Sequence, residues 1–178
     1  MLIAKINNPV PVDYKQAFPN TSFPPSGPSD DFLAAEGYAK VNAFKEHDRA
    51  TQKLVTAKPY YEAPWVYTVQ VADKTADELA ADQSAQAKAL QDSIVQATQQ
   101  RLDDFARTRS YDGILSACTY ATSGVERFAT EGRYAVQVRD ETWATLYAIL
   151  DQVQAGERPA PNSFADIEAE LPNLQWPA

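Results

Sequence analysis

The sequence has little of the chemistry that enzymes and metalloproteins use. Its 178 residues include one cysteine, one histidine and six glycines. A single cysteine, Cys118, excludes an intrachain disulfide framework, and its place on an apolar helix face predicts a small core residue rather than a reactive thiol. No Gly-x-Ser-x-Gly motif and no glycine-rich phosphate loop are present.

The ionisable residues that do occur lie next to one another in the sequence. His47 belongs to the run KEHDR at residues 45–49, which lacks the second histidine or cysteine that a metal site usually needs. The carboxylate pairs Asp30–Asp31 and Asp103–Asp104 are also sequence neighbours, with nothing to place them across a cleft. We therefore expect solvated charge runs, no metal, no cofactor and no enzymatic activity.

Basic clusters and long hydrophobic runs are also missing. The net charge of −8 repels a phosphate backbone, so we expect no nucleic-acid partner. The longest apolar-leaning stretch, Trp143–Leu150, is far shorter than the roughly 20 residues of a membrane helix, so we expect no membrane insertion. The start, MLIAKINNPV, lacks the pattern of a signal peptide, which predicts a cytosol-like environment.

The first region, residues 1–73, is rich in proline and aromatics. A short strand is expected at Leu2–Ile6, ended by Asn7-Asn8-Pro9. The segment 18–28 contains four prolines and cannot form regular structure. It suits either a segment that lies across another protein or an ordinary loop. Its candidate attachment residues are Phe18, Phe23, Pro24 and Pro25.

One short helix and two strands are expected in the rest of this region. The helix covers Asp30–Ala35, and the strands cover Gln52–Lys58 and Trp65–Val71. In the second strand, alternation places Trp65 and Tyr67 on one face with Val69 and Val71, and Val66 on the other. The two strands are predicted to form a hairpin with a wide loop.

The second region, residues 74–108, predicts one long helix from Thr75 to about Arg107. Thr75 and Glu78 have the spacing of a capping box. The apolar stripe is narrow, so the helix must dock on its own domain, pair with copies of itself, or serve as a solvent-flanked connector. Between residues 87 and 97 the stripe has coiled-coil spacing, which favours a homotrimer before a dimer. The candidate subunit contacts are Leu79, Ala87, Leu90, Ile94, Ala97, Leu102 and, near the C-terminus, Trp176.

The third region, residues 109–178, predicts two or three antiparallel helices. The first is expected to begin at Ser110 or Asp112 and to end at Gly124, while Gly132 splits or bends the next segment. Gly156 is expected to close that helix. The residues expected on the buried side of the first helix are Ile114, Leu115, Ala117, Cys118 and Ala121.

The chain end is predicted to be an apolar strap. Ser163 is expected to cap a brief helix that runs to Glu170. Leu171, Leu174 and Trp176 then fold back over the helices, or else Trp176 inserts into a neighbouring subunit. The predicted fold class is thus α+β: a hairpin-containing N-terminal half, a long central helix and a helical C-terminal module, in an oligomeric, fibre-like assembly.

The order of these pieces resembles one protein family. In the C-terminal part, the pieces are a Tyr-Asp helix at 111–112, an aromatic-rich helix, a proline turn, and a closing Leu-Pro and Trp-Pro at 171–177. In the N-terminal part they are NTSFP at 20–24, the stretch from Leu33 to Gly37, KLV at 53–55, WVY at 65–67 and TADELAA at 75–81. The chain resembles bacteriophage tail and tail-fibre-associated proteins. Many of those have Asp-Gly before the Trp, whereas this chain has Glu62-Ala63-Pro64.

The resemblance implies a structural protein of a phage tail, either a short tail fibre or a baseplate-associated fibre. Its implied partners are copies of itself and other tail or baseplate proteins, and its implied location is the virion, after synthesis in the host cytoplasm. Related modules also occur in tail-fibre assembly chaperones, so that alternative stays open. A weaker third possibility is receptor binding, in which Tyr60, Tyr61, Trp65 and Tyr67 stack on sugars.

Overall fold

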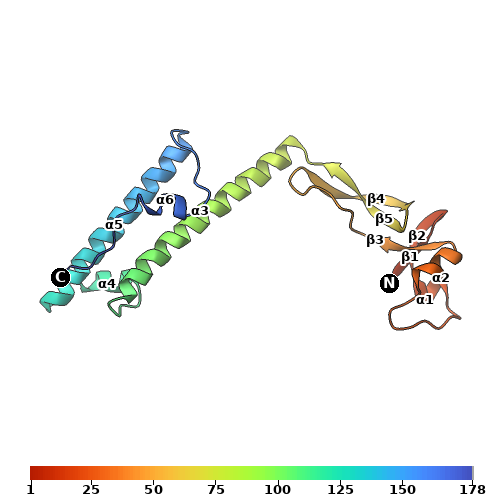
Figure 1. The fold of residues 1–178 in the computed structure, drawn as a ribbon, viewed down its shortest axis with the longest axis horizontal. Helices are drawn as coiled ribbons and strands as arrows, with labels where there is room; N and C mark the ends of the chain where they lie inside the picture. The colour runs from red at the N-terminus through yellow and green to blue at the C-terminus, as the bar shows by residue number, and fades with distance from the viewer. Residues whose placement is uncertain (178) are drawn as a thin grey trace. The chain divides into compact units, whose positions relative to one another are not determined.

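A five-stranded sheet comes first in the chain and helices follow it, as Figure 1 shows for the computed structural model, which describes residues 1–177. The predicted α+β class is confirmed. The chain divides into two units, Met1–Asp82 and Gln83–Ala178, here called the sheet unit and the helical unit. The division falls inside the long helix, so the region predicted as 74–108 contributes to both units.

The sheet has the strand order β2-β1-β3-β5-β4, and only the β3–β5 pairing is parallel. Two short helices, α1 (Tyr14–Ala17) and α2 (Asp30–Ala35), lie in the connections. The predictions at β1 and α2 are confirmed, whereas β2 and β3 were not predicted. The strands are β1 (Leu2–Lys5), β2 (Asn8–Asp13), β3 (Tyr38–Asn42), β4 (Gln52–Glu62) and β5 (Trp65–Asp73).

Prolines misled the prediction at both edges of the sheet. β2 contains Pro9 and Pro11, and an edge strand tolerates residues that cannot donate to a ladder. At the other edge, β4 continues through Pro59, where the pairing shifts register between Thr56 and Tyr60. The prediction of a wide hairpin loop is therefore wrong: Glu62 pairs with Trp65, and only Ala63 and Pro64 form the turn.

The buried core of the sheet unit is small. Val66 on β5 and Ala4 on β1 are fully buried, and Ala39 on β3 is buried beside them. Trp65, on the opposite face of β5, is only half-buried. A separate aromatic cluster holds the first connection together, with ring centroids 5.2–6.0 Å apart in edge-to-face pairs. Its members are Tyr14, Phe18, Phe23, Phe32 and Tyr38.

The long helix, α3, runs over Ala76–Arg107, as predicted. The capping box is confirmed, because the amide of Glu78 donates to Thr75 Oγ1 over 3.2 Å and the amide of Thr75 donates to Glu78 Oε2 over 2.9 Å. The remaining helices are α4 (Ile114–Thr119), the 3₁₀ turn η1 (Tyr120–Thr122), α5 (Glu126–Gln154) and α6 (Ala165–Glu168).

Two apolar clusters hold the helical unit together. One joins α3, α4 and α5 around Leu102, Ile114 and Val138. The other joins α3, α5 and α6 around Ile94 and Leu146 with Ile149, Ile167 and Leu171. Each α-helix of the unit therefore contributes to a shared interior.

The start of α4 differs from its prediction. Ser110 adopts a left-handed backbone with φ of 65°, and the helix begins at Ile114. The amide of Ile114 donates over 2.8 Å to Asp103 Oδ1, so the carboxylate that caps α4 comes from α3. Leu115, predicted to be buried, is 63% exposed. The helical segment ends with η1 at Thr122, before the predicted end at Gly124.

Gly132 does not split its helix, which corrects that part of the prediction. It lies inside α5, where an added Cβ would stand 2.3 Å from the amide nitrogen of Ala121 and 2.4 Å from the carbonyl carbon of Tyr120. The missing side chain thus permits close approach of the backbone at η1 to α5. The prediction at Gly156 is confirmed, since this residue follows the end of α5 with φ of 72°.

The chain end folds back on its own unit, which confirms the predicted apolar strap. Leu171 belongs to the cluster around Ile94, and Leu174 packs against the cluster around Leu102. The Trp176 ring stacks on Phe105 with centroids 4.3 Å apart. The brief helix α6 does not use Ser163 as its cap: the carboxylate of Asp166 accepts from the amides of Asn162 and Ser163 instead.

Candidate functional site

The predicted subunit-contact stripe on α3 is largely used inside the chain. Leu102 is fully buried and Ile94 is 2% exposed, so neither is available to a neighbouring subunit while the helical unit is folded. Leu90 is half-buried against the cluster around Ile94. Trp176 is held by its stacking on Phe105 and by a 3.0 Å hydrogen bond from its Nε1 to Thr108 Oγ1.

The remaining stripe residues keep part of their surface. Ala87 is exposed, and Leu79 and Ala97 are half-buried. Around Ala87, every residue of the run Gln83–Ala89 is exposed. A groove of about 400 Å³ adjoins this run. Its apolar lining is Ala87, Leu90, Ile94, Leu150, Val153, Ala160 and Pro161.

The predicted attachment segment is folded onto the sheet unit rather than extended. Phe18 and Phe23 are half-buried in the aromatic cluster, while Pro24 and Pro25 remain exposed. The carbonyl of Pro24 accepts from the amide of Gly27 over 2.9 Å, and Gly27 adopts φ of 84°, which closes the loop. Pro24 and Pro25, here called the proline tip, are therefore presented at the surface, as are residues 19–22 and Ser26 of the same segment.

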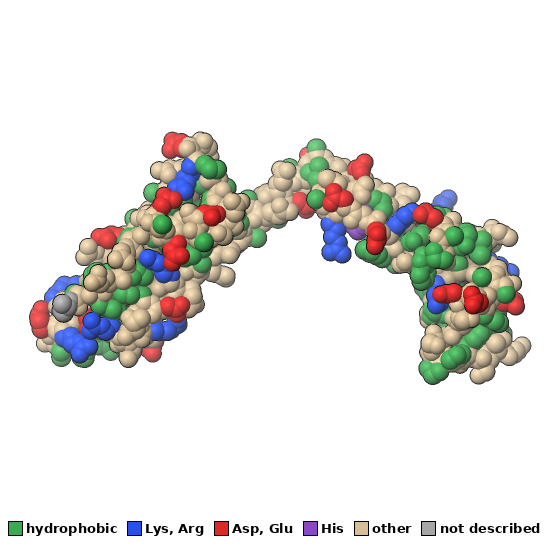
Figure 2. All heavy atoms as spheres, viewed as in Figure 1, with side chains coloured by type: hydrophobic (Ala, Val, Ile, Leu, Met, Phe, Trp, Pro, Cys, Tyr) green, Lys and Arg blue, Asp and Glu red, His purple; other side chains and the backbone are tan. Residues whose placement is uncertain are grey.

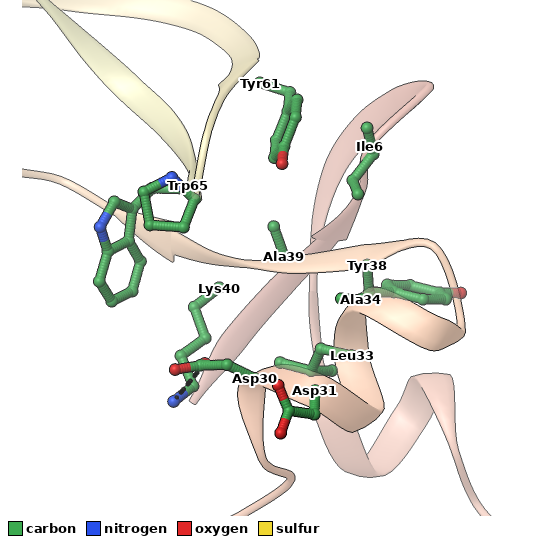
Figure 3. Close-up of a pocket in the computed structure, with 11 residues that line it drawn as sticks. Ile6, Asp30, Asp31, Leu33, Ala34, Tyr38, Ala39, Lys40, Tyr61 and Trp65 are labelled. Atoms are coloured by element: carbon green, nitrogen blue, oxygen red, sulfur yellow. Dashed lines mark ion pairs between the residues drawn. The ribbon is translucent and has the colours of Figure 1, made fainter.

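A cavity of about 200 Å³, here called the aromatic hollow, opens on the sheet unit (Figure 3). In Figure 3, Asp30, Asp31 and Leu33 come from α2, Ala39 and Lys40 come from β3, and Tyr61 and Trp65 flank the hairpin turn. Leu33 is 1% exposed and Ala39 is 7% exposed, so the floor is aliphatic. The complete lining is Ile6, Asp30, Asp31, Leu33, Ala34, Tyr38, Ala39, Lys40, Tyr61, Pro64 and Trp65.

A second, more open hollow lies beside the first. It has a volume of about 510 Å³ and is lined by the proline loop, including Phe23, Pro24 and Pro28. The two hollows share Asp30 and Lys40, whose carboxylate and ammonium form an ion pair of 2.8 Å. Figure 2 shows hydrophobic side chains at the surface of the sheet unit next to acidic ones. The proline tip and the hairpin turn thus contribute to one continuous surface.

The charge of the aromatic hollow is uneven. Lys40 compensates Asp30, which leaves the charge of Asp31. Within residues 1–177 the Asp31 carboxylate has neither a hydrogen bond nor an ion pair. The hollow therefore combines one uncompensated carboxylate with two aromatic rings that reach solvent, because Tyr61 is 40% exposed and Trp65 is half-buried.

The other two aromatics of the hairpin are already occupied. Tyr60 and Tyr67 pair across β4 and β5, and the Lys45 ammonium lies 5.6 and 5.1 Å from their ring centroids. The same ammonium donates to Glu62 Oε2 over 2.6 Å, and this hydrogen bond raises the pKa of Lys45. Of the four aromatics considered for sugar stacking, only Tyr61 and Trp65 line the hollow.

The most buried polar cluster belongs to the helical unit. Glu131 is 4% exposed and accepts from the Tyr111 hydroxyl over 2.7 Å. Arg109 and Arg127 donate to the same carboxylate over 3.0 and 3.1 Å. Burial alone would raise the pKa of Glu131, but these hydrogen bonds and charges hold it below its ordinary value. Burial and the contact with Glu131 raise the pKa of Tyr111 to about 12.

His47 belongs to the sheet unit and Cys118 to the helical unit. His47 Nδ1 lies 2.9 Å from the Lys45 carbonyl oxygen, and burial raises the pKa of the Cys118 thiol. No group of three His, Cys, Asp or Glu side chains that could hold a metal ion occurs in residues 1–177. Across the same residues, no helix is both long and apolar enough to cross a membrane.

The sequence-based prediction named only four of the residues that line the aromatic hollow as candidates for chemistry or binding. It named Tyr61 and Trp65 because aromatics are dense on the hairpin, and it named Asp30–Asp31 only as a pair without context. Lys40, Leu33 and Ala39 were missed, because nothing in the sequence indicates that β3 pairs with β5 and brings α2 beside the hairpin turn. Comparisons with protein-family models, curated proteins and solved structures found no match.

Proposed function

We propose that this chain is a structural protein of a bacteriophage tail, either a short tail fibre or a baseplate-associated fibre. Its role is non-catalytic protein–protein assembly, and its place is the virion, after synthesis in the host cytoplasm. The phage setting is supported by the ordered motifs of both halves, from NTSFP at 20–24 to the closing Trp-Pro at 176–177.

The observation that carries the assembly role is the pair of adjoining hollows on the sheet unit. Exposed aromatic rings beside proline and aliphatic surface are typical of protein–protein contact surfaces. The predicted attachment tip, Pro24 with its neighbours, lies on this surface. The sheet unit is therefore the part that attaches the chain to other tail or baseplate proteins in our proposal.

Self-association is the second part of the proposal. Ala87 and its exposed neighbours on α3 supply the contact, together with the accessible parts of Leu79, Leu90 and Ala97. An exposed helical run is marginal in water by itself and gains stability from a packing partner. We expect a homotrimer before a dimer. Sedimentation velocity over a range of protein concentrations tests this, and a monomer at every concentration would contradict it.

A tail-fibre assembly chaperone is the alternative function. The exposed aromatic surface would serve a chaperone equally well, because it would bind a fibre tip during maturation. Quantitative mass spectrometry of washed virions separates the two functions. A structural protein is present at a fixed number of copies per particle, and a chaperone that departs is absent from particles but present in infected cells.

A further inference from the structure

We infer that copies of this chain associate head to tail, with an exposed aromatic patch at one end of the helical unit packed in an apolar groove at the other end of the next copy. The aromatic patch consists of Tyr120, Val125 and Phe128. The groove, here called the α3–α5 groove, is the one that adjoins the exposed run of α3. This inference deepens the proposed self-association and rests on it. The apolar residues of the groove that are not fully buried are Ala87, Leu90, Leu150, Val153, Ala160 and Pro161.

The aromatic patch lies where the chain passes from η1 into α5. Val125 is 53% exposed, and Tyr120 and Phe128 are also exposed. The rings of Tyr120 and Phe128 contact edge to face with centroids 5.7 Å apart, and the half-buried Tyr111 ring lies 5.4 Å from Tyr120. The exposed Arg127 follows directly in the sequence. Exposed aromatics beside an arginine have the composition of protein-binding hot spots.

The α3–α5 groove has the apolar surface that such a patch needs. Its volume is about 400 Å³. Leu90 and Leu150 are half-buried in its walls, and Ala87 is exposed beside them. In residues 1–177, α4 packs on the cluster around Leu102 and α6 packs on the cluster around Ile94, and neither helix fills the groove. A partner side chain would therefore complete the burial of the two leucines.

The two surfaces lie at opposite ends of the helical unit. α5 begins at Glu126, next to the patch, and ends at Gln154, which lines the groove. A helix of 29 residues is about 40 Å long, so one copy cannot pack its own patch in its own groove. The two surfaces can meet only between copies. Contact between two different surfaces builds a ring or an open chain of copies, and a ring of three is the homotrimer proposed above.

Charge identifies a second copy as the occupant of the groove. Residues 105–139, toward the patch, include five arginines and three carboxylates, a net charge of +2. Residues 140–170, toward the groove, include one arginine and seven carboxylates, a net charge of −6. Figure 2 shows basic side chains gathered at the end of the helical unit where α5 begins. Unlike ends of two copies therefore attract and like ends repel, which favours head-to-tail contact over a symmetric pairing.

The test is sedimentation velocity of the full-length chain with one surface changed at a time. Val125→Asp removes an apolar side chain from the patch and adds a negative charge. Val125 is the N-cap of α5 and makes no side-chain cap hydrogen bond, so Asp, which is favoured at this position, should preserve the fold. Ala87→Arg fills the groove and adds a positive charge at an exposed helix position that suits arginine.

Two control variants make the same chemical changes elsewhere. Leu115→Asp alters a leucine that is exposed in the first turn of α4 and is not part of the patch. Ala85→Arg alters an exposed alanine of the same α3 run that does not line the groove. Circular dichroism establishes that all four variants are folded. Both controls should associate like the unaltered chain.

The expected result has two parts. Val125→Asp and Ala87→Arg should each weaken association by about tenfold or more, as expected for loss of a central contact. An equimolar mixture of these two variants should form a dimer and nothing larger. The first variant still has an intact groove and the second still has an intact patch, so one productive contact remains. Higher salt should weaken the association, because it screens the attraction between unlike ends.

Two results would overturn the head-to-tail contact and leave self-association standing. One is undiminished association of either patch or groove variant alone. The other is a mixture of the two variants that stays monomeric although the unaltered chain associates. An unaltered chain that is monomeric at every concentration would instead contradict self-association itself, and the inference with it. Because none of these measurements needs a phage particle, their failure is distinguishable from failure of the virion experiment.

Discussion

The two units use their apolar residues differently. In the helical unit, α3, α4, α5 and α6 share two buried clusters, and even the C-terminal Trp176 packs on the unit's own side chains. In the sheet unit the buried cluster is small, and Trp65 and Tyr61 reach solvent beside a hollow. Large side chains stabilise the first unit by burial, whereas Trp65 and Tyr61 of the second remain accessible to solvent, where we propose that a partner binds. The helical unit also exposes large apolar side chains, such as Tyr147 and Val125, but it is the hollow beside Trp65 and Tyr61 that supports the proposed attachment through the sheet unit.

The largest expected effect is in the helical core. Leu102→Ala should lower the free energy of unfolding by about 3 to 4 kcal/mol, because it leaves a cavity among fully buried neighbours. Leu115→Ala, at a leucine that is 63% exposed, should cost less than about 0.5 kcal/mol. Urea unfolding followed by circular dichroism measures both. Equal losses would contradict the burial of Leu102 in the cluster that joins α3, α4 and α5.

Gly132→Ala should lower the free energy of unfolding by about 2 kcal/mol or more. Alanine normally stabilises a helix interior over glycine by about 1 kcal/mol, so the sign of the effect is diagnostic. Here the new Cβ would meet the backbone of Ala121 at 2.3 Å, which forces η1 away from α5. Gly124→Ala is the control, because nothing lies within 4 Å of its added Cβ. Thermal unfolding of the pair gives the comparison, and a stabilised Gly132→Ala variant would refute the close approach.

Glu131→Gln should lower the free energy of unfolding by about 2 kcal/mol at neutral pH, since it weakens the hydrogen bonds from Arg109 and Arg127. The pKa of Glu131 is lowered in the folded protein. Its contribution to stability is therefore present above the unfolded pKa of about 4.3 and is lost as pH falls through the lower folded pKa. Urea unfolding at several pH values should show the two proteins converging below about pH 4. A constant difference down to pH 2 would contradict the ionised state of this cluster.

Asp103→Ala should have the smallest of these effects, about 1 kcal/mol, because it removes the acceptor for the first amide of α4. Asp104→Ala, at the exposed neighbour that contacts Arg107 and Gln100, should cost less than about 0.5 kcal/mol. Amide hydrogen exchange at Ile114 is the sharper readout. Exchange there should speed up in the first variant only, and unchanged exchange would mean that α4 has another cap.

Local patterns predicted the elements whose signals lie within a few residues. The capping box at Thr75 and Glu78, the strand at Leu2–Lys5 and the helix end before Gly156 all have such signals. Features that depend on distant residues were not predictable. The cap of α4 comes from Asp103, eleven positions away, and Gly132 is required by the backbone at Ala121.

Several features of the sheet edges, of α3 and of the candidate site also depend on distant residues and were not predicted for that reason. Prolines in β2 and β4 resemble strand breakers until their edge positions are known. The coiled-coil spacing on α3 is real, but a single chain supplies its own partner, α5, for Ile94 and Leu102. Asp31 and Trp65 come to line the same hollow only through the parallel pairing of β3 with β5. Periodicity identifies a face that needs burial without identifying what covers it.

The most direct test of the central claim compares particle incorporation of two surface variants. Trp65→Ala changes the aromatic hollow, and Leu115→Ala changes an exposed apolar residue of the helical unit. Circular dichroism first establishes that both variants fold, and mass spectrometry of washed virions then counts their copies relative to the unaltered chain. The proposed attachment through the sheet unit predicts a marked loss for Trp65→Ala and none for Leu115→Ala. Full incorporation of a folded Trp65→Ala chain, or loss for Leu115→Ala alone, would contradict it.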